Sequence, residues 1–196
     1  MSPECPPVRT PLAEFELPGV EGTHYCFVFD PLTIDLVATR ALIHFDEATF
    51  KIVAFHVFRA LEFLHTKAQM VHGGASLFFH ELLSAVTLNQ DLRAENFLLT
   101  ALDQSIFQDL EIFERIHPSV RKIYSDRTIY SGVHVIPEDP QLLGVPVLCD
   151  FGEARFGQEC YNDPIQPFMY QAPEVVFMIP WSYPADVWNA GVMVSL

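Results

Sequence analysis

The strongest hydrophobic pattern in the chain lies between Asp46 and Lys67. Apolar side chains recur there every three or four positions, which is the spacing of one buried stripe on an α-helix. They are Phe50, Val53, Val57, Leu61 and Leu64. Asp46 is a favourable N-cap for such a helix. We therefore predict a long helix over residues 46–67, and a shorter one near residues 34–42.

Two strand-like segments precede this long helix, and two follow it. Residues 12–17 alternate weakly between apolar and polar side chains, and residues 24–29 are rich in aromatic and β-branched ones. A Pro-Gly pair between them favours a turn, so we predict a strand–turn–strand unit. The apolar runs at residues 97–99 and 145–149 predict two short buried strands.

The remaining segments give weaker patterns. Residues 106–116 have helical spacing that ends at His117-Pro118, because a residue that precedes Pro resists the helical region. Residues 119–144 hold many turn-forming side chains and predict a long surface excursion with one strand at 128–130. Other helix-compatible segments are residues 75–88, 173–177 and 185–196.

Together these elements predict an α+β fold. A chain of 196 residues, half of them apolar, can bury a sizeable core in one domain and is not expected to be disordered. Residues 1–11 contain four Pro and no periodicity, so we expect an irregular N-terminus there.

Charge and cysteine content narrow the class of partner. The chain has 11 Lys and Arg against 25 Asp and Glu, a net charge of -14. We therefore expect no direct binding of nucleic acid, because phosphates are neutralised by clustered cations.

The four Cys are far apart and form no Cys-x-x-Cys pair, which is typical of a reducing compartment. With no leader peptide and no membrane-length apolar run, we expect no membrane partner and an intracellular protein of the cytoplasm or nucleus.

Three histidines are candidate metal ligands. His65, His72 and His80 are separated by seven and eight positions, whereas a helical metal pair prefers residues four apart. No nearby set of Cys or carboxylates completes four ligands. We interpret these histidines as core or surface residues.

The main candidates for chemistry are two acids and an amide. Asp91 and Asn96 lie just before the predicted strand at 97–99, and Asp150 directly follows the strand at 145–149. Mg²⁺ prefers oxygen ligands and usually takes one or two from protein, and phosphoryl transfer needs a carboxylate that orients the attacking hydroxyl. The alternative is that Asp91 and Asn96 only cap helices or form turns.

Four motifs occur in the order that is found in eukaryotic protein kinases, and the chain resembles that superfamily over about residues 12–196. The motifs are Asp91-x-x-x-x-Asn96, Asp150-Phe151-Gly152, Ala172-Pro173-Glu174 and Asp186-Val187-Trp188-x-x-Gly191. Within the superfamily, segments 24–29, 91–96, 149–155 and 183–188 resemble the SR-protein kinases, especially their divergent fungal members.

The resemblance implies roles for individual residues. Asp91 matches the catalytic carboxylate, and Arg93 stands where most Ser/Thr kinases have a Lys that contacts the γ-phosphate. Asn96 and Asp150 match the Mg²⁺ ligands. Phe29 matches the gatekeeper at the back of the adenine site, and the hinge from Asp30 to Leu32 would bind the adenine of ATP. Glu174 and Asp186 are expected to be structural rather than chemical.

The resemblance also implies an architecture. We expect an incomplete protein-kinase-like fold, in which residues 12–32 are a remnant of the β-rich N-terminal lobe with the hinge, and residues 33–196 are a truncated, mainly helical C-terminal lobe. The helix at 46–67 should be its central buried helix. The strands at 97–99 and 145–149 should pair and bring Asn96 and Asp150 to one Mg²⁺.

Three departures from the kinase pattern affect the expected activity. There is no Gly-rich phosphate loop, and none of the three Lys lies on a strand upstream of the hinge, so part of the phosphate clamp is missing. The chain also ends within the helix that begins near Asp186. In kinases a His stands two residues before the catalytic Asp, whereas His72 precedes Asp91 by 19 positions.

Residues 73–90 therefore look like an insertion in the catalytic loop. We interpret them as intron sequence read through in frame or as an artefact of gene prediction, and sequencing of the mature transcript across this junction tests the hypothesis. If the insertion belongs to the protein, His72 should no longer brace the catalytic loop from its usual place.

The predicted function is that of a serine/threonine protein kinase that uses ATP and Mg²⁺, with weak or no activity in this chain. The protein substrate would be basic and rich in Arg and Ser, by analogy with the SR-protein kinases. The alternative is a catalytically inactive, pseudokinase-like binding module or a mis-spliced product.

Overall fold

The structure is a computed structural model. It describes residues 7–19, 22–73, 94–125, 127–131, 135–137, 139–166, 168 and 170–195. Asp91 and Arg93, and nearly all of the segment that we interpret as an insertion, lie outside these residues. The predicted helix at 75–88 lies outside them as well.

The long hydrophobic pattern forms a helix close to where the sequence predicts it. Helix α2 spans Glu47–Phe63, and a π-helical turn, η1, continues it over Leu64–Ala68. The carboxylate of Asp46 accepts a hydrogen bond from the backbone N–H of Thr49 (2.8 Å), so Asp46 is the N-cap. Helix α1, Leu36–Leu42, begins in the same way, because the carboxylate of Asp35 accepts from the N–H of Ala38.

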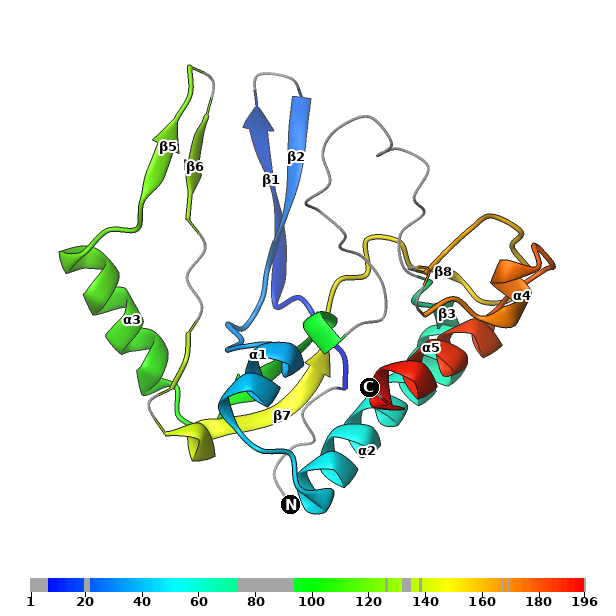
Figure 1. The fold of residues 1–196 in the computed structure, drawn as a ribbon. Coiled ribbons are helices and arrows are strands. Elements are labelled where there is room, and N and C mark those ends of the chain that lie inside the picture. Colours follow the sequence, from blue (N-terminus) through cyan, green and yellow to red (C-terminus); the bar gives the residue numbers. More distant parts are fainter. Residues whose placement is uncertain are drawn as a thin grey trace.

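One face of α2 is buried and the other is exposed. Val57, Ala60 and Leu61 are almost completely buried, whereas Phe55 and Phe58 on the opposite side are exposed. α2 packs on strand β7 (Leu143–Leu148) and on helix α5 (Tyr183–Ser195), the last helix of the chain (Figure 1). The prediction of a central buried helix therefore holds for a single stripe and not for the whole helix.

All strands in the described part of the chain form two-stranded antiparallel pairs. β1 (Ala13–Gly19) and β2 (Gly22–Val28) form the predicted strand–turn–strand unit, which projects from the body of the molecule (Figure 1). β4 (Phe97–Ala101) pairs with β7, as predicted. The other two pairs are β3 (Met70–Val71) with β8 (Arg155–Phe156), and β5 (Arg121–Ile123) with β6 (Thr128–Tyr130).

Strand β6 and helices α3, α4 and α5 agree with the sequence patterns in type and position, whereas β5 and the 3₁₀ turns were not predicted. α3 spans Ser105–Ile116 and ends at His117, before Pro118. α4 spans Pro173–Val176, and two short 3₁₀ turns cover Ala94–Asn96 (η3) and Pro140–Leu142 (η4). No helix within the described residues has the length and apolar character that crossing a membrane requires.

Two groups of buried side chains form the core. The larger lies between α1, α2, β4, β7 and α5; its buried members are Val8, Leu36, Val57, Ala60, Leu61, Leu64, Phe97, Leu99, Leu148 and Ala190. The smaller surrounds the start of α5; it contains Val71, Ile165, Ala172, Val175, Trp181 and Ala185. The α+β class is confirmed, and the arrangement is compatible with part of a kinase-like fold.

The N-terminal segment makes a contact that its sequence does not predict. Val8 forms a parallel bridge with Leu148, and the backbone N–H of Arg9 donates to the Leu148 carbonyl (2.8 Å). Val8 is buried in the larger core. Residues 7–9 therefore run along the free edge of β7, next to the strand end that carries Asp150.

Candidate active site

The β4–β7 pair brings two of the predicted site residues to neighbouring positions. Phe97 lies opposite Leu148, and the backbone N–H of Cys149 donates to the carbonyl of Asn96 (2.8 Å). Asn96 therefore lies at the start of β4, and Asp150 lies just past the adjacent end of β7. This is the strand pairing that the sequence predicts.

Asp150 stands at a sharp corner of the backbone. Its φ of 61° lies in the left-handed region, where Asp is tolerated better than most residues. A turn follows at once, because the N–H of Ala154 donates to the carbonyl of Phe151 (3.1 Å). Asp150 is exposed and Asn96 is half-buried, so the carboxylate is accessible to solvent.

The side chains of Asn96 and Asp150 provide the kind of donor atoms, oxygens, that a Mg²⁺ ion prefers. A carboxylate and an amide supply oxygen ligands, and Mg²⁺ usually keeps several waters when it binds phosphates. Within the described residues, no group of three or more His, Cys, Asp or Glu side chains forms a metal site. These two residues could therefore hold an ion that also binds phosphate, but not one enclosed by protein ligands alone.

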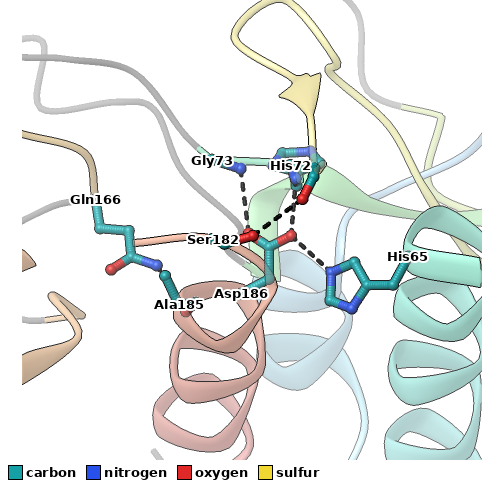
Figure 2. Close-up of polar contacts among 8 residues, drawn as sticks. His65, His72, Gly73, Gln166, Ser182, Ala185 and Asp186 are labelled. Carbon is teal, nitrogen blue, oxygen red and sulfur yellow. Dashed lines mark hydrogen bonds and ion pairs between the residues drawn. The ribbon is translucent and has the colours of Figure 1, made fainter. Parts of the chain in front are cut away.

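Asp186 lies at the centre of the polar contacts drawn in Figure 2. Its carboxylate is 1% exposed and lies in the first turn of α5. It accepts hydrogen bonds from the backbone N–H groups of His72 (2.7 Å) and Gly73 (3.1 Å), and its Oδ2 lies 3.0 Å from Nε2 of His65. A buried carboxylate is stable only with such donors. This geometry agrees with the expectation that Asp186 is structural.

His72 connects this carboxylate to the strand that carries Asp150. Its Nε2 lies 3.2 Å from the carbonyl oxygen of Cys149, and its ring packs edge-on against Phe151 at 5.4 Å. Since a carbonyl only accepts, Nε2 carries the proton in this contact. His72 is 2% exposed. It therefore braces the Asp150 corner, while its relation to Asp91 lies outside the described residues.

The segment that follows the predicted hinge residues is hydrogen-bonded to strand β4. After Asp30 the chain is fixed to β4, because the N–H of Thr33 donates to the carbonyl of Leu99 (2.9 Å). Phe29 and Leu32 are half-buried, and Asp30 is exposed. The connection from β2 to α1 therefore runs along β4, where Asp35 also forms an antiparallel bridge with Leu98.

Arg9 joins the hinge to β7, and sequence reasoning missed it. Its guanidinium lies over the ring of Phe29, 4.6 Å from the centroid, and Nη2 donates to the carbonyl of Asp30 (3.2 Å). One signal could have pointed to Arg9: it is the only Lys or Arg before Arg40 in the chain.

Cys149 directly precedes Asp150 in the chain, and its thiol is buried. Burial raises its pKa to about 11, and the positive charge of Arg9 opposes this increase. Cys149 is therefore a neutral thiol at physiological pH. It acts as a small core residue and not as a nucleophile.

Comparison with known proteins identifies the class to which this chain belongs. No protein-family model matches it. A serine/threonine protein kinase of Aspergillus fumigatus is 31% identical over 191 residues, which cover 95% of this chain and 41% of that protein. The dual specificity protein kinase CLK1 of Homo sapiens is 25% identical over 171 residues, covering 86% of this chain and 27% of that kinase. The chain is therefore a divergent member of the protein kinase superfamily.

The relatives themselves are fungal Ser/Thr kinases and dual specificity kinases that are SR-protein-kinase-like, which agrees with the resemblance seen in the sequence. A third relative, the dual specificity protein kinase lkh1 of Schizosaccharomyces pombe, is 42% identical over 50 residues, which cover 25% of this chain. The chain spans less than half the length of each of these relatives.

Proposed function

We propose that this chain carries part of the active site of a serine/threonine protein kinase, which transfers the γ-phosphate of ATP to protein hydroxyl groups. The observation that carries the proposal is the β4–β7 pair, whose adjacent ends hold Asn96 and Asp150. Oxygen donors on two fixed strand ends suit a Mg²⁺ ion, which neutralises phosphate charge during transfer.

Each candidate residue has a distinct task in this proposal. Asn96 and Asp150 would hold Mg²⁺, and Phe29 with the hinge at Asp30 and Leu32 would bind the adenine of ATP. Asp91 would accept the hydrogen bond of the attacking hydroxyl and orient it towards the phosphate. Arg93 would place a positive charge near the γ-phosphate, although a planar guanidinium is not equivalent to the compact ammonium of Lys.

The bracing of the Asp150 corner supports this assignment. His72 contacts Cys149 and Phe151 on one side, and its backbone is held by the buried Asp186 on the other. Catalysis by positioning needs groups whose orientation is fixed by such surroundings. We therefore propose that the Asp150 carboxylate is held in place before nucleotide binds.

The proposed protein substrate is basic and rich in Arg and Ser. The support is the net charge of -14, since an acidic surface attracts positively charged segments. The compartment that we propose is the cytoplasm or the nucleus. Cys26, Cys149 and Cys160 are free thiols, which is usual in a reducing compartment.

Phosphate incorporation tests the proposed activity. The purified chain is incubated with Mg²⁺ and labelled ATP, together with an Arg/Ser peptide or a matched Asp/Ser peptide. We expect slow transfer to the Arg/Ser peptide, and none with Asp150→Ala. Transfer that survives in Asp150→Ala at the wild-type rate would contradict the role of Asp150.

A non-catalytic binding module is the second candidate. It is favoured by the sequence between His72 and Asp91, which separates two residues that lie two positions apart in kinases. A module of this kind would bind Mg-ATP or a partner without transferring phosphate. Ligand binding stabilises the folded state, so weak binding of Mg-ATP by either candidate should give only a small thermal shift. Binding without transfer would support this candidate and exclude the first.

A further inference from the structure

The hairpin of β5 and β6 follows α3 and projects away from the core helices α2 and α5 (Figure 1). All residues of both strands are exposed, and the two strands pack mainly on each other. A two-stranded hairpin on its own is only marginally stable in water, yet Ile123 and Tyr130 are 70% and 61% exposed. Exposed apolar surface of this kind indicates contact with another molecule.

The same hairpin is a positively charged segment of an acidic chain. Residues 119–137 contain three Lys and Arg against one Asp, whereas the rest of the chain contains eight Lys and Arg against 24 Asp and Glu. Arg121 and Lys122 are exposed, and no ion pair joins either of them to an acidic side chain in the part of the chain that the structure describes. An acidic partner would therefore be attracted to this hairpin and repelled by most of the remaining surface.

The two faces of the hairpin combine cations with apolar side chains. Nζ of Lys122 lies 4.9 Å from the ring centroid of Tyr124, and the guanidinium of Arg127 lies 5.4 Å from the same centroid. Residues two apart on a strand share a face, so Arg121 and Ile123 lie on the opposite face of β5. Both faces therefore suit a partner that carries acidic and apolar side chains together.

The outer edge of β5 adds backbone groups to this surface. Within the described residues, β5 pairs with no strand other than β6. The carbonyl of Val120 and the N–H of Tyr124, at the two ends of β5, bond to the other arm of the hairpin. Because inward and outward backbone groups alternate in an antiparallel ladder, the N–H and C=O groups of Arg121 and Ile123 face outward. An extended peptide can add to such an edge as a further strand.

We propose that the outer edge of β5 binds an extended acidic segment of a partner protein, which adds to the hairpin as a third strand. Acidic side chains of this segment lie beside Arg121 and Lys122, and its apolar side chains cover Ile123. The inference goes beyond the proposed function, because it needs neither nucleotide nor any residue of the candidate active site. A short peptide is favoured over nucleic acid, because a long polyanion would also meet the acidic surface of the rest of the chain.

Fluorescence anisotropy with the whole 196-residue chain tests this proposal. The probe is a labelled peptide in which five Glu alternate with five Val, and the references are the same peptide with Lys in place of Glu and an oligothymidylate of equal charge. The variant Arg121→Glu/Lys122→Glu reverses the two charges beside the edge. Lys51→Glu/Lys67→Glu is the matched control, because both of these Lys are exposed and lie outside the hairpin.

We expect Arg121→Glu/Lys122→Glu to bind the Glu peptide about tenfold more weakly than the wild type, and the Lys51→Glu/Lys67→Glu control to bind it as the wild type does. The Lys peptide should bind more weakly than the Glu peptide. Added salt should weaken binding of the Glu peptide by screening the attraction.

Two proline substitutions separate pairing at the edge from simple attraction of charge. Ile123→Pro removes an outward N–H of β5 that the hairpin does not use, and Thr128→Pro does the same on β6, since Thr128 lies opposite Ile123. We expect Ile123→Pro to abolish binding of the Glu peptide and Thr128→Pro to leave it unchanged. Far-UV circular dichroism checks that each variant is folded.

Three outcomes would overturn the proposal. Equal binding of the Glu peptide by the wild type and Arg121→Glu/Lys122→Glu would exclude the two cations, and equal effects of the two proline substitutions would exclude the edge of β5. Tighter binding of oligothymidylate than of the Glu peptide would make nucleic acid the partner. If the wild type binds none of the probes, the cations only protect a free strand edge from unwanted pairing, and the proposal fails.

Discussion

Asp186 is the residue on which most of the polar contacts around the candidate site converge. Two backbone N–H groups and one histidine ring nitrogen lie within hydrogen-bond distance of a carboxylate that is 1% exposed. In Asp186→Asn, an amide NH₂ replaces one acceptor oxygen and faces donors. We expect a loss of about 3 kcal/mol of unfolding free energy, as for other buried charged groups that lose their partners.

Urea unfolding followed by tryptophan fluorescence measures this loss. Asp109→Asn, on the exposed surface of α3, is the matched control and should stay within about 0.5 kcal/mol of the wild type. If Asp186→Asn is no less stable than this control, then the carboxylate does not hold the His72 segment in place.

The buried thiol of Cys149 should make the stability of the folded protein depend on pH in the alkaline range. Burial raises the pKa of its thiol in the folded protein to about 11, from a reference value of 9.0. Between these values the unfolded chain loses the proton while the folded chain keeps it, so stability falls as the pH rises from about 9 to about 11. Stability of the wild type should therefore decline more steeply over this range than that of Cys149→Ala.

Alkylation provides a second measurement of the same thiol. At mildly alkaline pH, iodoacetamide should modify the exposed Cys160 much faster than the buried Cys149, because only the thiolate reacts. In urea, both cysteines should react at similar rates. Equal rates in the folded protein would show that Cys149 is accessible and would contradict its burial.

At the scale of elements, the N-terminus of α2 is the clearest case of local sequence control. The carboxylate of Asp46 accepts the N–H of Thr49, and this backbone hydrogen bond lowers the pKa of the carboxyl below 3.8. A lowered pKa means that the contribution to stability is present above the reference value and is lost as the pH falls through the folded value.

Asp46→Ala should therefore lower the melting temperature at pH 7 by ~3 °C. The difference from the wild type should become smaller towards pH 3. Asp46→Asn retains an oxygen that can accept the same hydrogen bond and should lose much less. Differential scanning calorimetry measures both variants, and an Asp46→Ala protein that melts with the wild type at pH 7 would refute the cap.

The elements that the sequence predicts are those whose signals are local. The α2 stripe, the cap at Asp46 and the apolar strands β4 and β7 each depend on side chains within a few positions of one another. β3 and β8 were not predicted, because strands of two residues are too short to show a period. Their pairing joins Val71 to Arg155 across 84 positions.

The candidate site also contains residues that local motifs predict and contacts that no local motif predicts. Asn96 and Asp150 could be identified because each belongs to a short motif next to an apolar strand. The contact of Asp186 with His72 spans 114 positions, and no local pattern indicates it. Arg9 could not be placed either, since its position depends on the bridge between Val8 and Leu148 and on the ring of Phe29.

At the scale of the whole molecule, apolar side chains exposed near the C-terminal helix have a consequence for association. An open groove of about 770 Å³ lies between α4 and α5, and Val187 and Trp188, both nearly half exposed, contribute to it. Phe177 and Met178 next to it are 74% and 83% exposed. Exposed apolar surface of this kind favours contact with another protein.

We expect the isolated chain to self-associate through this face as its concentration rises. The net charge of -14 opposes association, so added salt should increase the associated fraction by screening the repulsion. Val187→Glu should shift the population towards monomer. Ile112→Glu, at an equally exposed apolar position on α3, adds the same charge and should have little effect. Sedimentation velocity measures both variants, and an equal response to the two substitutions would mean that net charge, and not the α4–α5 face, controls association.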